Sequence, residues 1–173
     1  VAFCKVIEKK YKGNKHKVSS KLIADMFGDV VAEYQKAEIA ELQKQNPNAA
    51  LPPQLGMACE ASHVDGSMNA GEKEAELSWL KASDGLPENT CRILSNVRCL
   101  SEGVDVASLD AVLFLTPRNS QVDVVQSVGR VMRRAQGKEL GYVILPVVIP
   151  AGIEPEAALD KNENYRVVWQ VLN

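Results

Sequence analysis

Residues 111–134 of this chain read AVLFLTPRNSQVDVVQSVGRVMRR, and this stretch decides the fold class. It opens with a short apolar run, 111–115, which is typical of a buried strand. A loop follows, and then a longer segment, 122–134, in which we expect a helix. A strand followed by a helix is one β-α unit, and a series of such units builds a mostly parallel sheet covered on both faces by helices.

The same alternation continues along the rest of the chain. Further strands are expected at residues 1–7, 58–64, 92–97 and 141–149. Helices are expected from a cap at Ser19 or Ser20 toward Gln45, at 70–81, and at the C-terminus, where Tyr165, Val168, Trp169 and Leu172 form one apolar stripe. The sequence therefore predicts an α/β fold of three layers, with helices flanking a central sheet.

A proline-containing loop interrupts this pattern without ending the domain. Pro47, Pro52 and Pro53 cannot continue a helix, so residues of about 44–57 are interpreted as an inserted loop. The 173 residues contain 46% hydrophobic and 24% charged residues, which suits one globular domain spanning 1–173. Because apolar or helical patterns run into both ends, we expect this domain to be a fragment of a larger protein.

The charge of the chain limits the kind of nucleic-acid contact it can make. A net charge of -2 and a pI near 5.8 exclude a globally basic coat protein, so any such contact must be local. One basic stretch near the N-terminus is either a local patch or a solvated loop; its lysines are Lys5, Lys9, Lys10, Lys12, Lys15, Lys17 and Lys21.

Cysteine usage and hydropathy indicate an intracellular protein. The four cysteines form no CxxC pair and are interpreted as reduced, buried thiols, with no metal site. No apolar run approaches the roughly 18 residues of a membrane span, and no signal peptide is present at the start. We therefore expect a cytoplasmic protein without membrane contact.

Two arginines in the segment 126–134 are candidates for phosphate binding. Arg130 and Arg133 are three residues apart and project from one side of a helix, so both guanidinium groups can approach one anion. Their planar, permanently charged groups suit a phosphate. The alternative is an exposed basic helix in which Gly129 is a weak point.

A second candidate site follows the strand predicted at 92–97. Residues 101–105 read SEGVD and lie where ligands bind on open α/β sheets, beyond the carboxyl ends of the strands. Gly103 permits a close backbone approach, and Asp105 could bind a ribose hydroxyl or hold one of the arginines. Taken alone, the segment is also compatible with an ordinary turn.

Together, and in this order, the two segments resemble motifs V and VI of superfamily 2 helicases, whose motif VI has the form QxxGRxxR. The resemblance implies a RecA-like C-terminal lobe in which Arg130 and Arg133 are arginine fingers, the catalytic residues. By the same resemblance Gln126, Gly129, Gly103 and Asp105 bind nucleotide.

Earlier segments resemble the same family. Residues 1–5 look like the motif IV strand, and residues 63–68 look like the turn that touches the nucleic-acid backbone. By position, Lys5, Gly66 and Ser101 become candidate phosphate contacts, with Arg98 added for its charge near motif V; such contacts position a motor without reading sequence. The family usually has an arginine in the helix after this turn, where the present chain offers Lys73.

The residues of the two motifs most resemble those of large bacterial restriction-modification-type helicases. This resemblance implies as partners an N-terminal RecA-like lobe of the same polypeptide, DNA, and nuclease and methyltransferase domains. Because the chain has no GxxxxGK[ST] loop and no paired acidic residues to hold magnesium, ATP and Mg²⁺ should be bound mainly by the missing lobe. The isolated chain should then be inactive. The alternative function is a noncatalytic RecA-like module that binds DNA or protein.

Overall fold

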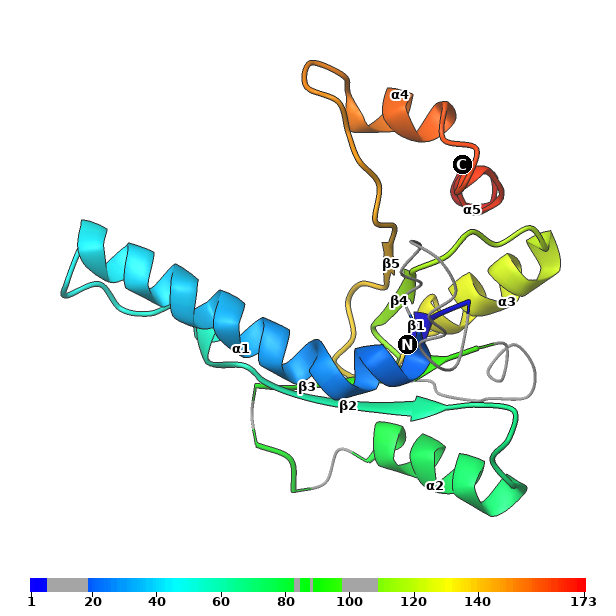
Figure 1. The fold of residues 1–173 in the computed structure, drawn as a ribbon, viewed down its shortest axis with the longest axis horizontal. Helices are drawn as coiled ribbons and strands as arrows, with labels where there is room; N and C mark the ends of the chain where they lie inside the picture. The colour runs from blue at the N-terminus through cyan, green and yellow to red at the C-terminus, as the bar shows by residue number, and fades with distance from the viewer. Residues whose placement is uncertain (6–18, 83–84, 88, 98–108) are drawn as a thin grey trace, which may run out of the picture.

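A computed structural model describes residues 1–5, 19–82, 85–87, 89–97 and 109–173 of the chain. Within these residues the fold is a five-stranded sheet with the strand order β2-β3-β1-β4-β5, and every pairing is parallel (Figure 1). The strands are β1 (Ala2–Phe3), β2 (Ala58–Val64), β3 (Thr90–Asn96), β4 (Ala111–Phe114) and β5 (Tyr142–Ile144). The α/β class and the parallel sheet predicted from the sequence are confirmed.

The core lies on the sheet face that α2 (Ala70–Lys81) and α3 (Gln121–Val131) cover. Side chains alternate across each strand, so Phe3, Leu94 and Phe114 point to this face and are at most 3% exposed. The rings of Phe3 and Phe114 stack at 5.4 Å between centroids. Apolar side chains of α2 and α3, such as Leu77 and Val124, complete one continuous cluster, which fixes both helices on the sheet.

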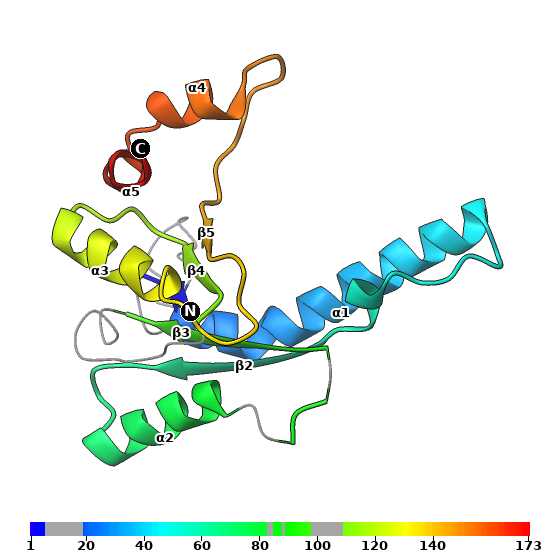
Figure 2. The same cartoon turned by 180° about the vertical axis from the view of Figure 1, so that it is seen from behind.

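The opposite face of the sheet carries the long helix α1 (Ser20–Gln45) over β2 and β3. Ser19 caps it by accepting a bond from the Leu22 backbone N–H at 3.1 Å, as predicted. Gly28 lets the helix approach β2, because a Cβ there would lie only 2.9 Å from the Cys59 carbonyl oxygen. Farther along, α1 runs out beyond the sheet (Figures 1 and 2).

The last part of the chain packs against α3. After β5 come α4 (Pro155–Asp160) and α5 (Arg166–Leu172), with the indole N–H of Trp169 donating to Asp160 at 2.6 Å. Tyr165 and Val168 of the predicted apolar stripe are buried, whereas Leu172 is 41% exposed. The stripe is therefore a core face only over its first part.

Several element boundaries differ from the sequence prediction. The helix α3 ends at Val131 instead of Arg134, and β5 covers only three residues of the segment predicted as a strand at 141–149. Pro146 and Pro150 limit strand pairing in that segment. The irregular loop begins at Asn46, after α1, and contains one short 3₁₀ helix, Pro53–Gly56.

The cysteine prediction needs one correction. Cys4 is buried and is a free thiol, as expected, but Cys59 and Cys91 are only partly buried. They stand opposite one another in the register of β2 and β3, near the start of both strands, where the strands are less buried than at their ends. Cys99 lies outside the described residues.

Candidate nucleotide and nucleic-acid interface

The helix α3 separates a core face from an exposed face that carries the candidate nucleotide residues. Its buried side chains follow helical spacing and are Val124, Ser127, Val128 and Val131. Gln126 and Gly129 lie on the solvent side, and Arg130 is partly exposed in the last turn. A Cβ added at Gly129 would meet no atom within 4 Å, so packing within the described residues does not require a glycine there.

Arg130 and Arg133 lie close enough to feel each other's charge, although only Arg130 belongs to the helix. The Arg133 backbone N–H donates to the Arg130 carbonyl at 3.3 Å, just after α3 ends. Burial and the neighbouring Arg133 charge both lower the pKa of Arg130. Two adjacent guanidinium groups repel one another, and an anion bound between them would relieve that repulsion. The arrangement therefore suits a phosphate.

The end of α3 is held by a residue that sequence reasoning missed. The Lys138 ammonium donates to the carbonyls of Leu109, Val131 and Arg133. In the sequence, Lys138 stands out only within a Gly-Lys pair that lacks the rest of a phosphate-binding loop. Nothing in its local pattern indicates that its target is the end of α3.

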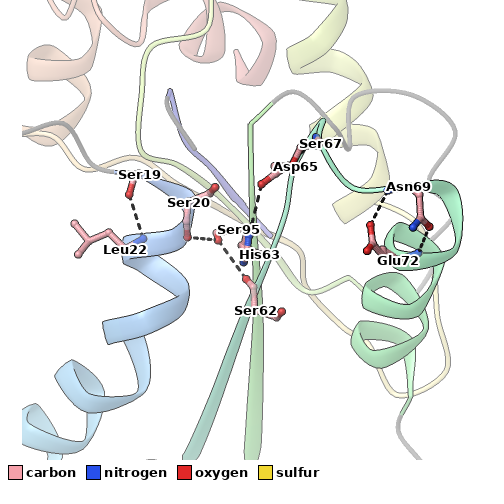
Figure 3. Close-up of polar contacts among 10 residues, drawn as sticks. All are labelled: Ser19, Ser20, Leu22, Ser62, His63, Asp65, Ser67, Asn69, Glu72 and Ser95. Carbon is pink, nitrogen blue, oxygen red and sulfur yellow. Dashed lines mark hydrogen bonds and ion pairs between the residues drawn. The ribbon is translucent and has the colours of Figure 1, made fainter. Parts of the chain in front are cut away.

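Gly66 is exposed in a tight turn at the carboxyl end of β2, and Figure 3 shows Asp65 and Ser67 in this turn. Asp65 is 2% exposed and accepts bonds from both the backbone N–H and the hydroxyl of Ser67. His63 lies 3.6 Å from the other carboxylate oxygen of Asp65. The Ser67 hydroxyl bond is the main cause that lowers the pKa of Asp65, so this carboxylate stays charged and holds the turn.

The N-terminus of α1 is fixed beside the same turn. The Ser95 hydroxyl of β3 lies 2.6 Å from the Ser20 carbonyl and 3.2 Å from the Ser62 carbonyl, and it joins the helix to two strands (Figure 3). Asn69 and Glu72 form a reciprocal capping box that starts α2 next to Gly66. Two helices therefore begin at this edge of the sheet.

Two further cationic side chains lie at this edge. Lys5 follows β1 and is exposed. Arg118, which the sequence did not single out, follows β4, and its guanidinium lies 4.7 Å above the ring of Phe3. An arginine in a loop after a proline carries no periodic signal, so only the fold reveals its place.

The two groups of candidate residues occupy different ends of the sheet. Lys5 and Gly66 follow the carboxyl ends of β1 and β2. In contrast, α3 runs antiparallel to β4, and Lys138 ties its last turn to the Leu109 carbonyl just before β4 begins. The arginine pair is therefore near the amino end of β4.

Four predicted site residues cannot be placed. Gly103, Asp105, Arg98 and Ser101 lie outside the described residues, and their proposed roles remain predictions. Among the residues that are described, no group of three His, Cys, Asp or Glu side chains could hold a metal ion. No helix in that part of the chain is long and apolar enough to cross a membrane.

Comparison with known proteins gives consistent matches. Residues 28–135, more than half of the chain, match the family described as helicase conserved C-terminal domain. A solved structure described as the ATP-dependent Type ISP restriction-modification enzyme LlaBIII bound to DNA is 40% identical over 99% of this chain, with a TM-score of 0.66. A protein of African swine fever virus (isolate Pig/Kenya/KEN-50/1950), named "Probable helicase A859L", is 39% identical over 57 residues, 33% of this chain. The chain spans only 9% of the restriction enzyme and 7% of the viral protein.

Proposed function

Because the chain belongs to the family of helicase conserved C-terminal domains, we propose that it is the second motor lobe of an ATP-dependent DNA helicase or translocase. In this proposal Arg130 and Arg133 act on the phosphates of ATP, which an N-terminal RecA-like lobe of the same polypeptide holds together with Mg²⁺. The observation that carries the proposal is the placement of Arg130 in the last turn of α3 with Arg133 just beyond it, joined by the 3.3 Å bond from the Arg133 N–H to the Arg130 carbonyl.

The chemistry of phosphoryl transfer explains why two arginines are needed there. Negative charge on the transferring phosphoryl group must be stabilised, and an arginine supplied across an interface contributes roughly 10³ to 10⁵ in rate. Arg130 and Arg133 would supply the positive charge that stabilises this group. Four further residues would contact the nucleotide: Gln126, Gly129, Gly103 and Asp105. When it is bound, Mg²⁺ would neutralise phosphate charge from the other lobe.

The surface around the arginines suits the docking of a second lobe. Three large apolar side chains on and just after α3 are strongly exposed, Val122 by 65%, Val125 by 51% and Met132 by 65%. Exposed apolar groups gathered around charged ones are typical of an interaction surface. The other lobe would cover them when it closes over ATP.

The carboxyl edge of the sheet would contact DNA. The Gly66 backbone and Lys5 are exposed there, and together with Ser101 and Arg98 they would bind phosphates without reading bases. The similarity to a DNA-bound Type ISP enzyme over nearly the whole chain supports a restriction-modification context with nuclease and methyltransferase domains. A motor of this kind would act in the cytoplasm.

The test uses a polypeptide that joins this chain to its N-terminal lobe. DNA-stimulated ATP hydrolysis is measured for the parent, Arg130→Ala, Arg133→Ala and, as a matched control, Arg134→Ala. Arg134 is exposed next to the pair but stands outside the motif. We expect the first two variants to lose about 10³-fold or more in kcat and the control to stay near the parent.

The result also separates the alternative function. If Arg130→Ala and Arg133→Ala hydrolyse ATP at the parental rate, the arginine-finger role is wrong. If the parent itself shows no ATP hydrolysis but binds DNA, the chain is a noncatalytic binding module.

A further inference from the structure

The segment that carries Arg133 receives bonds from the Lys138 side chain and lies next to a close backbone contact at Gly141. At the end of α3 the Val128 carbonyl accepts from the Met132 N–H and the Arg130 carbonyl accepts from the Arg133 N–H, so the backbone itself satisfies part of the last turn. The Lys138 ammonium donates to the Val131 carbonyl and, at 3.1 Å, to the carbonyl of Arg133 itself. One cation therefore serves both the helix end and the arginine beyond it.

The same ammonium fastens this turn to the sheet. Its third bond, of 2.6 Å, goes to the carbonyl of Leu109, which leads into β4. In the sequence Leu109 closely follows Gly103 and Asp105, the other residues proposed for the nucleotide edge. Lys138 thus joins the backbone at Arg133 to Leu109, which follows residues 101–105 in the sequence.

After Arg133 the chain forms a turn that brings Lys138 back to the end of α3. The Lys138 backbone N–H donates to the Ala135 carbonyl at 3.2 Å and closes a turn. Gly137 occupies the third position of that turn with φ of 77°, a conformation that favours glycine. The turn therefore reverses the chain and returns the lysine side chain to the helix end.

Gly141 closes the same arrangement from the other side. A Cβ at Gly141 would lie 2.5 Å from the Val131 carbonyl oxygen and 2.7 Å from its Cγ1 atom, so the backbone there touches the helix end. Any larger residue would displace the last turn of α3. The Lys138 bonds and the Gly141 contact both act on the backbone at the end of α3, and the Gly141 contact involves no charge.

We propose that Lys138 is a positioning residue for ATP hydrolysis, which sets the place of Arg133 by bonding the Val131 and Arg133 carbonyls at the end of α3. This inference rests on the proposed function of the two arginines. An ammonium at a helix C-terminus also interacts favourably with the helix dipole, so Lys138 stabilises the turn while it orients it. Arg133 lies two residues beyond the end of α3, and the Lys138 bond to its carbonyl adds to the 3.3 Å bond from its own N–H to Arg130.

The experiment is a double-mutant cycle in the two-lobe polypeptide. The variants are Lys138→Met, which keeps the length of the side chain but removes the charge, Arg133→Ala, and both together. ATP hydrolysis is measured at a temperature where urea unfolding shows each variant to be fully folded. Since a misplacement of about 1 Å can cost about a hundredfold in rate, we expect Lys138→Met to lower kcat at least tenfold with little change in KM.

The cycle distinguishes positioning from direct contact. If Lys138 acts through Arg133, the double variant is no slower than Arg133→Ala alone. Multiplied losses would mean that Lys138 contacts the nucleotide independently, and would overturn the proposal. Parental kcat for Lys138→Met would overturn it as well, whatever its stability.

Two further variants complete the design. Gly141→Ala should lower kcat without changing any charge, because it displaces the same turn. Lys161→Met, an exposed lysine after α4, is the matched control and should leave kcat unchanged. If Arg133→Ala itself keeps the parental rate, the proposed function fails; if Arg133→Ala is inactive but Lys138→Met and Gly141→Ala are not, only the positioning role fails.

Discussion

Two helical glycines with opposite surroundings allow one substitution to test the packing of the lobe. Gly129 lies on the exposed side of α3, where an added Cβ meets nothing within 4 Å. Gly28 lies in α1, where the same Cβ would stand 2.9 Å from the Cys59 carbonyl oxygen, closer than real contacts allow. Gly129→Ala and Gly28→Ala therefore add the same methyl group to a helix in opposite surroundings.

The expected changes in the free energy of unfolding have opposite signs. Alanine is favoured over glycine inside a helix by about 0.8 to 1 kcal/mol, and at Gly129 nothing offsets this gain. At Gly28 the methyl group must push α1 from β2, and overpacking of this kind costs about 1 to 3 kcal/mol. We expect Gly129→Ala to stabilise the chain by just under 1 kcal/mol and Gly28→Ala to destabilise it by about 1 kcal/mol.

Urea unfolding followed by circular dichroism measures both values. For a chain of this size, 1 kcal/mol corresponds to about 2 to 4 °C in Tm, which thermal unfolding can confirm. Stabilisation by Gly28→Ala, or destabilisation by Gly129→Ala at an unchanged m-value, would refute the packing described here. In the two-lobe polypeptide, Gly129→Ala should still lower ATP hydrolysis, because the site would require the glycine although the fold does not.

Two other predictions concern titrating groups. Asp65→Asn should destabilise the native chain by about 1 to 2 kcal/mol at pH 7. The folded pKa of Asp65 is lowered from 3.8, so the stabilisation by its carboxylate is present above that value and is lost as pH falls further. In acid titrations the free energies of unfolding of variant and parent should therefore converge. A difference between them that stays constant down to pH 2 would contradict this role of Asp65. Burial raises the pKa of Cys4 to about 11, so at pH 8 only about one thiol in a thousand is ionised. Mass spectrometry should find Cys4 unmodified by iodoacetamide in the native chain and modified in urea, and rapid native modification would contradict its burial.

The parts of the fold that follow from local chemistry could be read from the sequence. The strand at 58–64 and the helix at 70–81 occur with the expected bounds, and in the structure Asn69 and Glu72 form the capping box that starts this helix. The start of α1 was likewise visible from Ser19. These signals involve neighbours within one turn or one strand.

The end of α3 could not be predicted for the opposite reason. The pattern from Val122 to Arg134 continues as a helix would, and the helix stops at Val131 where Lys138 and Gly141 meet its last turn. Those contacts depend on how the chain returns to β5. Arg118 above Phe3 is similarly invisible, since the two residues are far apart in sequence.

The roles of the candidate site residues depend on even more distant partners. The arginine pair is visible in the sequence by its spacing, and the structure brings the two charges close together. In the proposed function their ligand would be held by a second lobe, which would cover a surface that this chain leaves exposed. Spacing within one lobe would then identify only half of the site.

The most direct test of the arginine-finger role compares two nucleotide states in the two-lobe polypeptide. Affinity is measured for ATP and for ADP with aluminium fluoride, which mimics the transferring phosphoryl group. Arginine fingers stabilise the transition state more than the ground state, so Arg130→Ala and Arg133→Ala should each weaken the mimic by about a hundredfold or more. ATP affinity should change by only a few fold. Equal weakening of both ligands, or of neither, would contradict the account.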